Sequence, residues 1–77
     1  MGKVNSTQVP LYYREQRGSF VESMKTIRPI NSIEELGEGV EVKNYGYDNR
    51  LKSPTQIVLQ GGAPIGFITL NGEVSHK

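Results

Sequence analysis

The sequence contains no cysteine, and its one histidine is the penultimate residue, His76. The absence of cysteine excludes disulfides, and a single histidine cannot form a zinc site of the Cys/His type. Hydrolytic or transfer catalysis usually needs a nucleophile activated by a base, or a pair of carboxyl groups. The sequence therefore predicts a protein that is not an enzyme.

Long apolar runs are also missing, because no stretch approaches the roughly 18 apolar residues of a membrane span. The N-terminus carries no apolar signal core behind a basic stretch. The lack of cysteine is compatible with a reducing compartment. We therefore expect a protein with no membrane partner, located in the cytoplasm.

The chain has little net charge, +1 at pH 7, so it has no overall field that would steer it toward nucleic acid or anionic lipid. The charge is unevenly distributed. Residues 1–30 hold five basic and two acidic side chains, and residues 31–42 hold four glutamates and no base. Any basic surface is expected to come mainly from the N-terminal third.

No pattern predicts a metal or another cofactor. Four glutamates and Asp48 could supply oxygen ligands, but they lack the alternate spacing and closing glutamate of an EF-hand. Gly61, Gly62 and Gly66 resemble a phosphate loop only loosely, because no Lys-Ser/Thr pair follows and a strand rather than a helix comes next. Turn or bulge glycines are the favoured interpretation.

The length of 77 residues allows one hydrophobic core. A chain this short buries only about 60% of the surface that its unfolded form exposes, so stability must come from packing or from self-association. Residues 1–10 are polar and end in a proline, which predicts a flexible N-terminal arm. Residues 11–75 are then expected to form a single domain.

In the first half of this domain, residues 11–18 predict a short extended segment that turns at Gly18. Residues 23–30 contain β-branched side chains and a proline, so we interpret them as a strand, with Pro29 at a sheet edge. Ser32 and Glu35 have the spacing of a capping box, which predicts a short helix that ends at Gly37.

In the second half, Val40 and Val42 alternate with charged residues, which is typical of a strand with one solvated face. Residues 44–54 mix aromatics with turn formers and predict a loop. Residues 55–60 and 64–70 predict two strands that pair as an antiparallel hairpin, because only three residues separate them. Asn71-Gly72 predicts a second hairpin, with residues 73–75 as a short returning strand.

This order predicts an α+β fold: a small, mainly antiparallel sheet of three to five strands with one short helix on one face. The predicted core consists of the apolar side chains Val21, Met24, Ile27, Ile33, Leu36, Val40, Val42, Ile57, Leu59, Ile65, Phe67 and Leu70.

Two clusters combine tyrosine with arginine, and they hold the candidate partner-binding residues Tyr12, Tyr13, Arg14, Arg17, Tyr45, Tyr47 and Arg50. Tyr and Arg are enriched in the hot spots of protein interfaces, and the same pair suits stacking on bases and binding of phosphates. A structural interpretation is also open, in which the tyrosines cap a small core and the arginines pair with nearby acids.

A family resemblance accompanies these clusters. It is carried by residues 13–18, residues 22–26, the helix start at residues 32–36, residues 45–50, and Gly66-Phe67. Over about residues 12 to 70 the chain resembles a group of small proteins encoded in bacteriophage and prophage genomes. The resemblance implies a viral or prophage origin and a host-bacterial cytoplasm, and it implies no function for any residue.

The leading hypothesis is a non-enzymatic phage or prophage accessory protein that binds another, unidentified protein through the two clusters. The alternative is weak binding of single-stranded nucleic acid by the same aromatics. We also expect a weak homodimer, because residues 55–70 carry no charged side chain. That segment would recruit a second copy if it lay at the edge of the sheet.

Overall fold

The computed structural model describes residues 11–74 and contains five strands, one short α-helix and one 3-10 turn. The strands are β1 (Leu11–Glu15), β2 (Arg28–Ile30), β3 (Val40–Asp48), β4 (Ser53–Gln60) and β5 (Ala63–Thr69), the helix is α1 (Phe20–Met24) and the turn is η1 (Ile33–Leu36). The predicted arm, residues 1–10, and Ser75 of the predicted returning strand lie outside the described residues.

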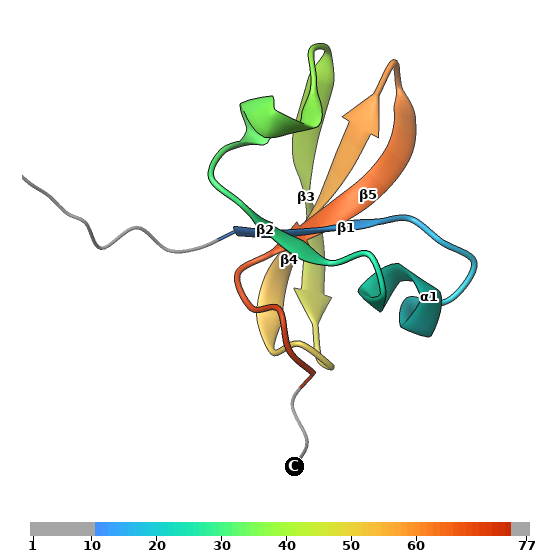
Figure 1. The fold of residues 1–77 in the computed structure, drawn as a ribbon, viewed down its shortest axis with the longest axis vertical. Coiled ribbons are helices and arrows are strands. Elements are labelled where there is room, and N and C mark those ends of the chain that lie inside the picture. The colour runs from blue at the N-terminus through green and yellow to red at the C-terminus, as the bar shows by residue number, and fades with distance from the viewer. Residues whose placement is uncertain (1–10, 75–77) are drawn as a thin grey trace, which may run out of the picture.

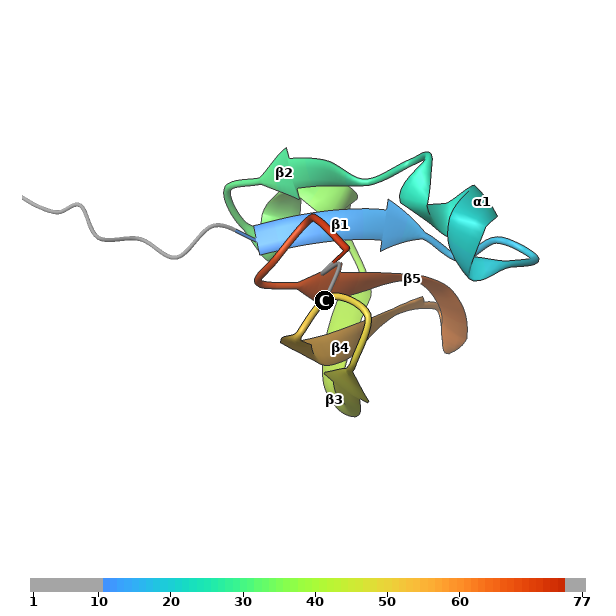
Figure 2. The same ribbon diagram turned by 90° about the horizontal axis from the view of Figure 1, so that it is seen from below.

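The five strands form one sheet in the order β2-β1-β5-β4-β3, and every neighbouring pair is antiparallel. Figure 1 shows that β1 and β2 run across the direction of β3, so the sheet is strongly coiled. Figure 2 shows α1 beside the end of β1. The predicted α+β class with a small antiparallel sheet is confirmed, as is the position of Pro29 on an edge strand.

Among residues 11–74, no helix has the length and apolar character needed to span a membrane.

The predicted hairpin is confirmed as β4 and β5. Gly61 and Gly62 connect the two strands with φ angles of 61° and 85°, values that suit a two-residue hairpin turn of type I′ and that glycine adopts without strain. Both strands are interior, because β3 flanks β4 and β1 flanks β5. The condition under which this hairpin would recruit a second copy is therefore not met, and the weak homodimer stays a prediction.

The segment of residues 23–30 is not one strand, as the sequence suggested. Ser19 caps α1, since its Oγ accepts a hydrogen bond from the amide of Glu22 at 3.2 Å, and the Ser23 hydroxyl donates to the Phe20 carbonyl at 2.8 Å. The β-branched residues come after the helix, where Thr26 Oγ1 donates to the Ser23 carbonyl at 2.7 Å. Local capping by side chains therefore outweighs strand propensity here, and only Arg28–Ile30 pairs in the sheet.

The predicted helix after Ser32 is a single 3-10 turn, η1. Ser32 makes no side-chain cap, and the Glu35 carboxylate accepts instead from the amide of Asn31 at 2.8 Å. The capping box is thus half formed and displaced by one residue. Gly37 ends the turn as predicted, with a φ of 116°.

Residues 44–48 were predicted to be a loop, but they continue β3 as far as Asp48. The register with β4 shifts between Asn44 and Gly46, which pair with Gln56 and Thr55. Tyr45 is therefore the extra residue of a β-bulge, a device that re-aims side chains in a strand. Ser53 and Pro54 are the first residues of β4 instead of the end of a loop.

The second hairpin predicted at Asn71-Gly72 does not form within the described residues. Asn71 Nδ2 instead donates to the carbonyls of Leu51, at 2.7 Å, and Glu73, at 3.1 Å. The Ser53 hydroxyl accepts from the amide of Leu70 at 2.8 Å. These bonds fix the turn between β3 and β4 against the end of β5, and Leu51 in that turn is completely buried.

The core lies on the face of the sheet that η1 covers. Its buried apolar side chains are Tyr13, Ile30, Val58 and Ile68, with Leu11, Ile33, Leu36, Val40, Val42 and Ile65 packed against them. Five of these residues, Ile33, Leu36, Val40, Val42 and Ile65, belong to the predicted core. Val21 and Leu70 were predicted inside but are 64% and 42% exposed.

Candidate functional site

The pairing of β1 with β5 places an arginine beside an aromatic ring on the face opposite the core. Arg14 and Phe67 are direct partners in the antiparallel register, whereas the core residue Tyr13 is opposite Ile68. Because alternate residues of a strand point to opposite faces, Arg14 and Phe67 share one face and Tyr13 and Ile68 share the other. The candidate site therefore begins on the second face of the sheet.

A buried ion pair links this face to the end of β3. Arg14 Nη2 donates to Asp48 Oδ2 at 3.3 Å, and the two side chains are only 6% and 8% exposed. Burial is the main influence on the guanidinium and lowers the pKa of Arg14, while the Asp48 carboxylate acts in the opposite direction. The pair is a fixed element of the structure, because unpairing either charge at this depth is costly.

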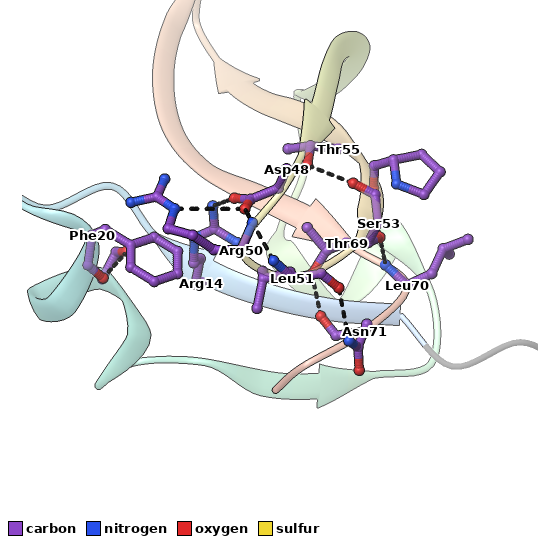
Figure 3. A network of polar contacts seen from close by, with 12 residues as sticks. Arg14, Phe20, Asp48, Arg50, Leu51, Ser53, Thr55, Thr69, Leu70 and Asn71 are labelled. Atoms are coloured by element: carbon purple, nitrogen blue, oxygen red, sulfur yellow. Dashed lines mark hydrogen bonds and ion pairs between the residues drawn. The ribbon is translucent and has the colours of Figure 1, made fainter. Parts of the chain in front are cut away.

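Asp48 also orders the turn that follows it. Its Oδ1 accepts from the amides of Arg50, at 2.8 Å, and Leu51, at 3.1 Å, in the manner of an Asx turn. The side-chain Nε of Arg50 lies 3.6 Å from the same oxygen. One carboxylate therefore serves two guanidinium groups and two backbone amides (Figure 3).

Aromatic rings surround these guanidinium groups. The guanidinium carbon of Arg14 lies 5.4 Å from the ring centre of Phe20 and 5.2 Å from that of Phe67. The guanidinium carbon of Arg50 lies 3.6 Å from the centre of the Phe20 ring, the distance of a stacked pair. Phe20 of α1 is thus in contact with both an interior and an exposed arginine.

The bulge in β3 adds a further ring to this face. Tyr45 lies with its ring centre 5.3 Å from that of Phe67, with the two planes tilted by 57°. Such tilted aromatic pairs are favourable because the edge of one ring meets the face of the other. Tyr45 still exposes 63% of its surface, and Tyr47 exposes 59%.

These residues line an open hollow, which we call the Tyr/Arg pocket, with a volume of about 530 Å³. It is lined by Arg14, Arg17, Gly18, Ser19, Phe20, Ser23, Tyr45, Tyr47, Asp48, Asn49, Arg50, Thr55 and Phe67. Its size falls within the range of pockets that hold small ligands or a few side chains.

The structure brings together five of the seven residues that the sequence singled out. Arg14 and Arg17 come from β1 and the turn after it, and Tyr45, Tyr47 and Arg50 come from the end of β3 and its turn. The other two lie elsewhere. Tyr13 is a core residue whose hydroxyl donates to the Ile65 carbonyl at 3.2 Å, and Tyr12 packs against Gly72.

Phe20 and Phe67 are the main pocket residues that sequence reasoning missed, and the buried position of Asp48 was not expected. Phe67 was predicted to belong to the core, and Phe20 carried no signal of its own, because its place depends on where α1 lies against β1. Asp48 was visible as a member of the second cluster. Its buried pairing with Arg14 depends on a contact between residues 34 positions apart, which no local pattern predicts.

No group of three or more His, Cys, Asp or Glu side chains suited to a metal ion occurs within residues 11–74. Compared with protein-family models, curated proteins and solved structures, the chain matches none of them.

Proposed function

We propose that this protein is a non-enzymatic accessory module that binds another protein through the Tyr/Arg pocket. The observation that carries the proposal is that the two arginines of the first cluster line one hollow with Tyr45, Tyr47 and Arg50 of the second, about 30 positions later in the sequence. Exposed tyrosines beside arginines are the side chains that most often dominate the energetics of protein interfaces.

The hydroxyl groups of the pocket support binding rather than catalysis. Ser19 accepts from the amide of Glu22, Ser23 donates to the Phe20 carbonyl, and Thr55 Oγ1 donates to the Ser53 carbonyl at 3.4 Å. Each is engaged with the backbone, and within residues 11–74 no histidine lines the pocket to activate one of them. A nucleophile normally needs such a neighbouring base.

The contacts that hold two exposed side chains of the pocket also favour a binding role. Arg50 is held by the Phe20 ring and by Asp48, and Tyr45 is held by the bulge and by Phe67. Side chains that are already ordered lose less conformational entropy when a partner binds. Residues 13–18 and 45–50, which contribute to this pocket, also carry the resemblance to phage and prophage proteins. That resemblance implies that the partner belongs to a phage or to its bacterial host.

The test is capture of a partner from a bacterial lysate by the full chain, with quantification of the recovered protein. Wild type is expected to retain a stoichiometric partner that the double variant Arg17→Ala with Tyr47→Ala loses. Arg28→Ala is the matched control, because Arg28 is an exposed arginine on the other face, stacked on Tyr13 at 5.6 Å. Equal recovery by wild type and the double variant, or no partner in any condition, refutes the proposal.

Nucleic acid is the competing ligand class, because exposed Tyr45 and Tyr47 could also stack on bases. The exposed cations of the pocket are Arg17 and Arg50, with Glu15 and Asp48 beside them, and two arginines do not form the extended basic track that a phosphate backbone needs. Titration with a labelled oligonucleotide at two salt concentrations separates the two classes. Tight, salt-dependent binding would favour nucleic acid over protein.

A further inference from the structure

The Tyr/Arg pocket has an excess of positive charge. Arg14, Arg17 and Arg50 line it, whereas Asp48 is the one acidic side chain of the lining and is shared by Arg14 and Arg50. Arg17 pairs with Glu15 outside the lining, and both of those side chains are about half exposed. An exposed pair of this kind is weak and can be exchanged for another partner at little cost.

The deepest cation is incompletely satisfied. A guanidinium carries five N–H donors, and in the described part of the chain the Nε and Nη1 atoms of Arg14 are buried without a hydrogen-bond partner. Asp48 is also shared with Arg50, so this one carboxylate balances only part of the positive charge of the two arginines. Uncompensated positive charge in a poorly solvated site favours an incoming anion.

The accessible cation is held ready for such an anion. Arg50 is 58% exposed at its side chain, lies over the Phe20 ring at 3.6 Å, and directs Nε toward Asp48. Within residues 11–74 its terminal Nη atoms take part in no hydrogen bond or ion pair. A guanidinium fixed in this way offers its remaining N–H groups to a carboxylate with little loss of side-chain entropy.

The walls next to Arg50 are aromatic. Phe20 and Phe67 both lie against the Arg14 guanidinium, and Tyr45 packs against Phe67 in a tilted pair. Such walls favour an apolar side chain, and they reduce the solvent screening of the neighbouring charges. A volume of about 530 Å³ has room for more than one side chain.

We infer that the pocket recognises a carboxylate on the partner protein, presented by an Asp or Glu next to an aromatic side chain. The carboxylate is placed at Arg50 and Arg17, above the buried charge of Arg14, and the aromatic side chain packs against Tyr45 and Phe67. This inference rests on the proposed function and specifies the chemistry of the segment that is bound.

The test uses two blocked dipeptides, N-acetyl-Phe-Glu-amide and N-acetyl-Phe-Gln-amide, titrated into the full chain and followed by NMR shifts, including the arginine Nε–H signals. We expect the Glu peptide to shift Arg50, Tyr45 and Phe67 and to bind about ten times more tightly than the Gln peptide. A tenfold difference is the size expected of one charge-assisted bond.

Three variants locate the effect. Arg50→Gln is expected to remove the difference between the two peptides, Arg50→Lys to keep part of it, and the control Arg28→Gln to leave it unchanged. Arg50 is exposed, so its variants are expected to fold; an unchanged amide spectrum away from the pocket checks this.

Equal affinity for the two peptides, no shift from either, or shifts away from the pocket would overturn the inference. If a partner is still captured and is lost in the Arg17→Ala and Tyr47→Ala variant, the proposed function survives that failure. A thymidylate octamer that binds more tightly than the Glu peptide would overturn the inference of carboxylate recognition in favour of phosphate recognition.

Discussion

Neutralising Asp48 is the perturbation whose consequence follows most directly from the structure. In Asp48→Asn the side-chain oxygen can still accept from the amides of Arg50 and Leu51, so the turn after β3 keeps its local bonds. What is lost is the negative charge 3.3 Å from the Arg14 guanidinium. The substitution therefore isolates the electrostatic contribution of the buried pair.

Removing one partner of a buried ion pair typically costs about 3–5 kcal/mol, because the remaining charge is left desolvated. With its oxygen kept on the two amides, the carboxamide turns its NH2 group toward the Arg14 guanidinium and offsets none of this, so we expect a loss of at least about 3 kcal/mol. A chain of this length has a free energy of unfolding of about 4–12 kcal/mol. With a urea m value of about 1 kcal/mol per molar, the unfolding midpoint should fall by about 3 M.

Urea denaturation of four proteins tests the reasoning: wild type, Asp48→Asn, Arg14→Met, and the double variant. The double variant leaves no uncompensated charge in place of the pair, so it should lose at least about 2 kcal/mol less than the sum of the single losses. Glu15→Gln is the control, because it neutralises an exposed pair and should cost less than about 0.5 kcal/mol. Additive losses, or an Asp48→Asn midpoint equal to that of Glu15→Gln, would refute the account.

Three further predictions concern other parts of the chain. Gly66→Ala should destabilise by about 2 kcal/mol or more by urea denaturation, because its Cβ would lie 2.4 Å from the Arg14 carbonyl oxygen; Gly18→Ala, with open space around it, should be near neutral. Burial, followed by the Glu15 charge, raises the pKa of Tyr13 above its ordinary value of 10.0. The contribution of the protonated Tyr13 phenol to stability is therefore complete below about pH 10 and is lost as the pH rises through the folded-state pKa. Tyr13→Phe should remove both a late phenolate absorbance step and this part of the alkaline loss of stability. For the weak homodimer, sedimentation equilibrium should give a mass that exceeds the 8.6 kDa of one chain and increases with protein concentration. A constant mass of 8.6 kDa would exclude the homodimer.

The parts of the fold that sequence predicts well are those with a strong local signal. The Gly61-Gly62 turn and its two apolar strands follow from adjacent residues, and so does the edge position of Pro29, which has no N–H to donate. Predictions based on β-branched side chains alone failed at α1, where one capping serine sets the local conformation.

The division of residues between the two faces of the sheet is harder to predict. Residues 55–70 carry apolar side chains on both faces, so the period-2 pattern does not distinguish Phe67 from the buried Ile68. The register also shifts between Val58 and Leu59 and at the Tyr45 bulge, and each shift changes which residues face the core. The two Tyr/Arg clusters were visible in the sequence, but their convergence depends on β1 pairing with β5.

The pairing of β1 with β5 also has a kinetic consequence. The Tyr13 hydroxyl bonds a carbonyl 52 residues later, and Arg14 cannot be enclosed on its side of the sheet until Phe67 is in place. Contacts this distant in sequence require a large loop to close first, which slows folding compared with a chain held together by neighbours. The β3–β4–β5 meander can assemble earlier from local turns, but it carries only part of the lining of the Tyr/Arg pocket. Binding of the proposed partner should consequently appear late in refolding, together with the docking of β1, so that partly folded chains lack a complete pocket.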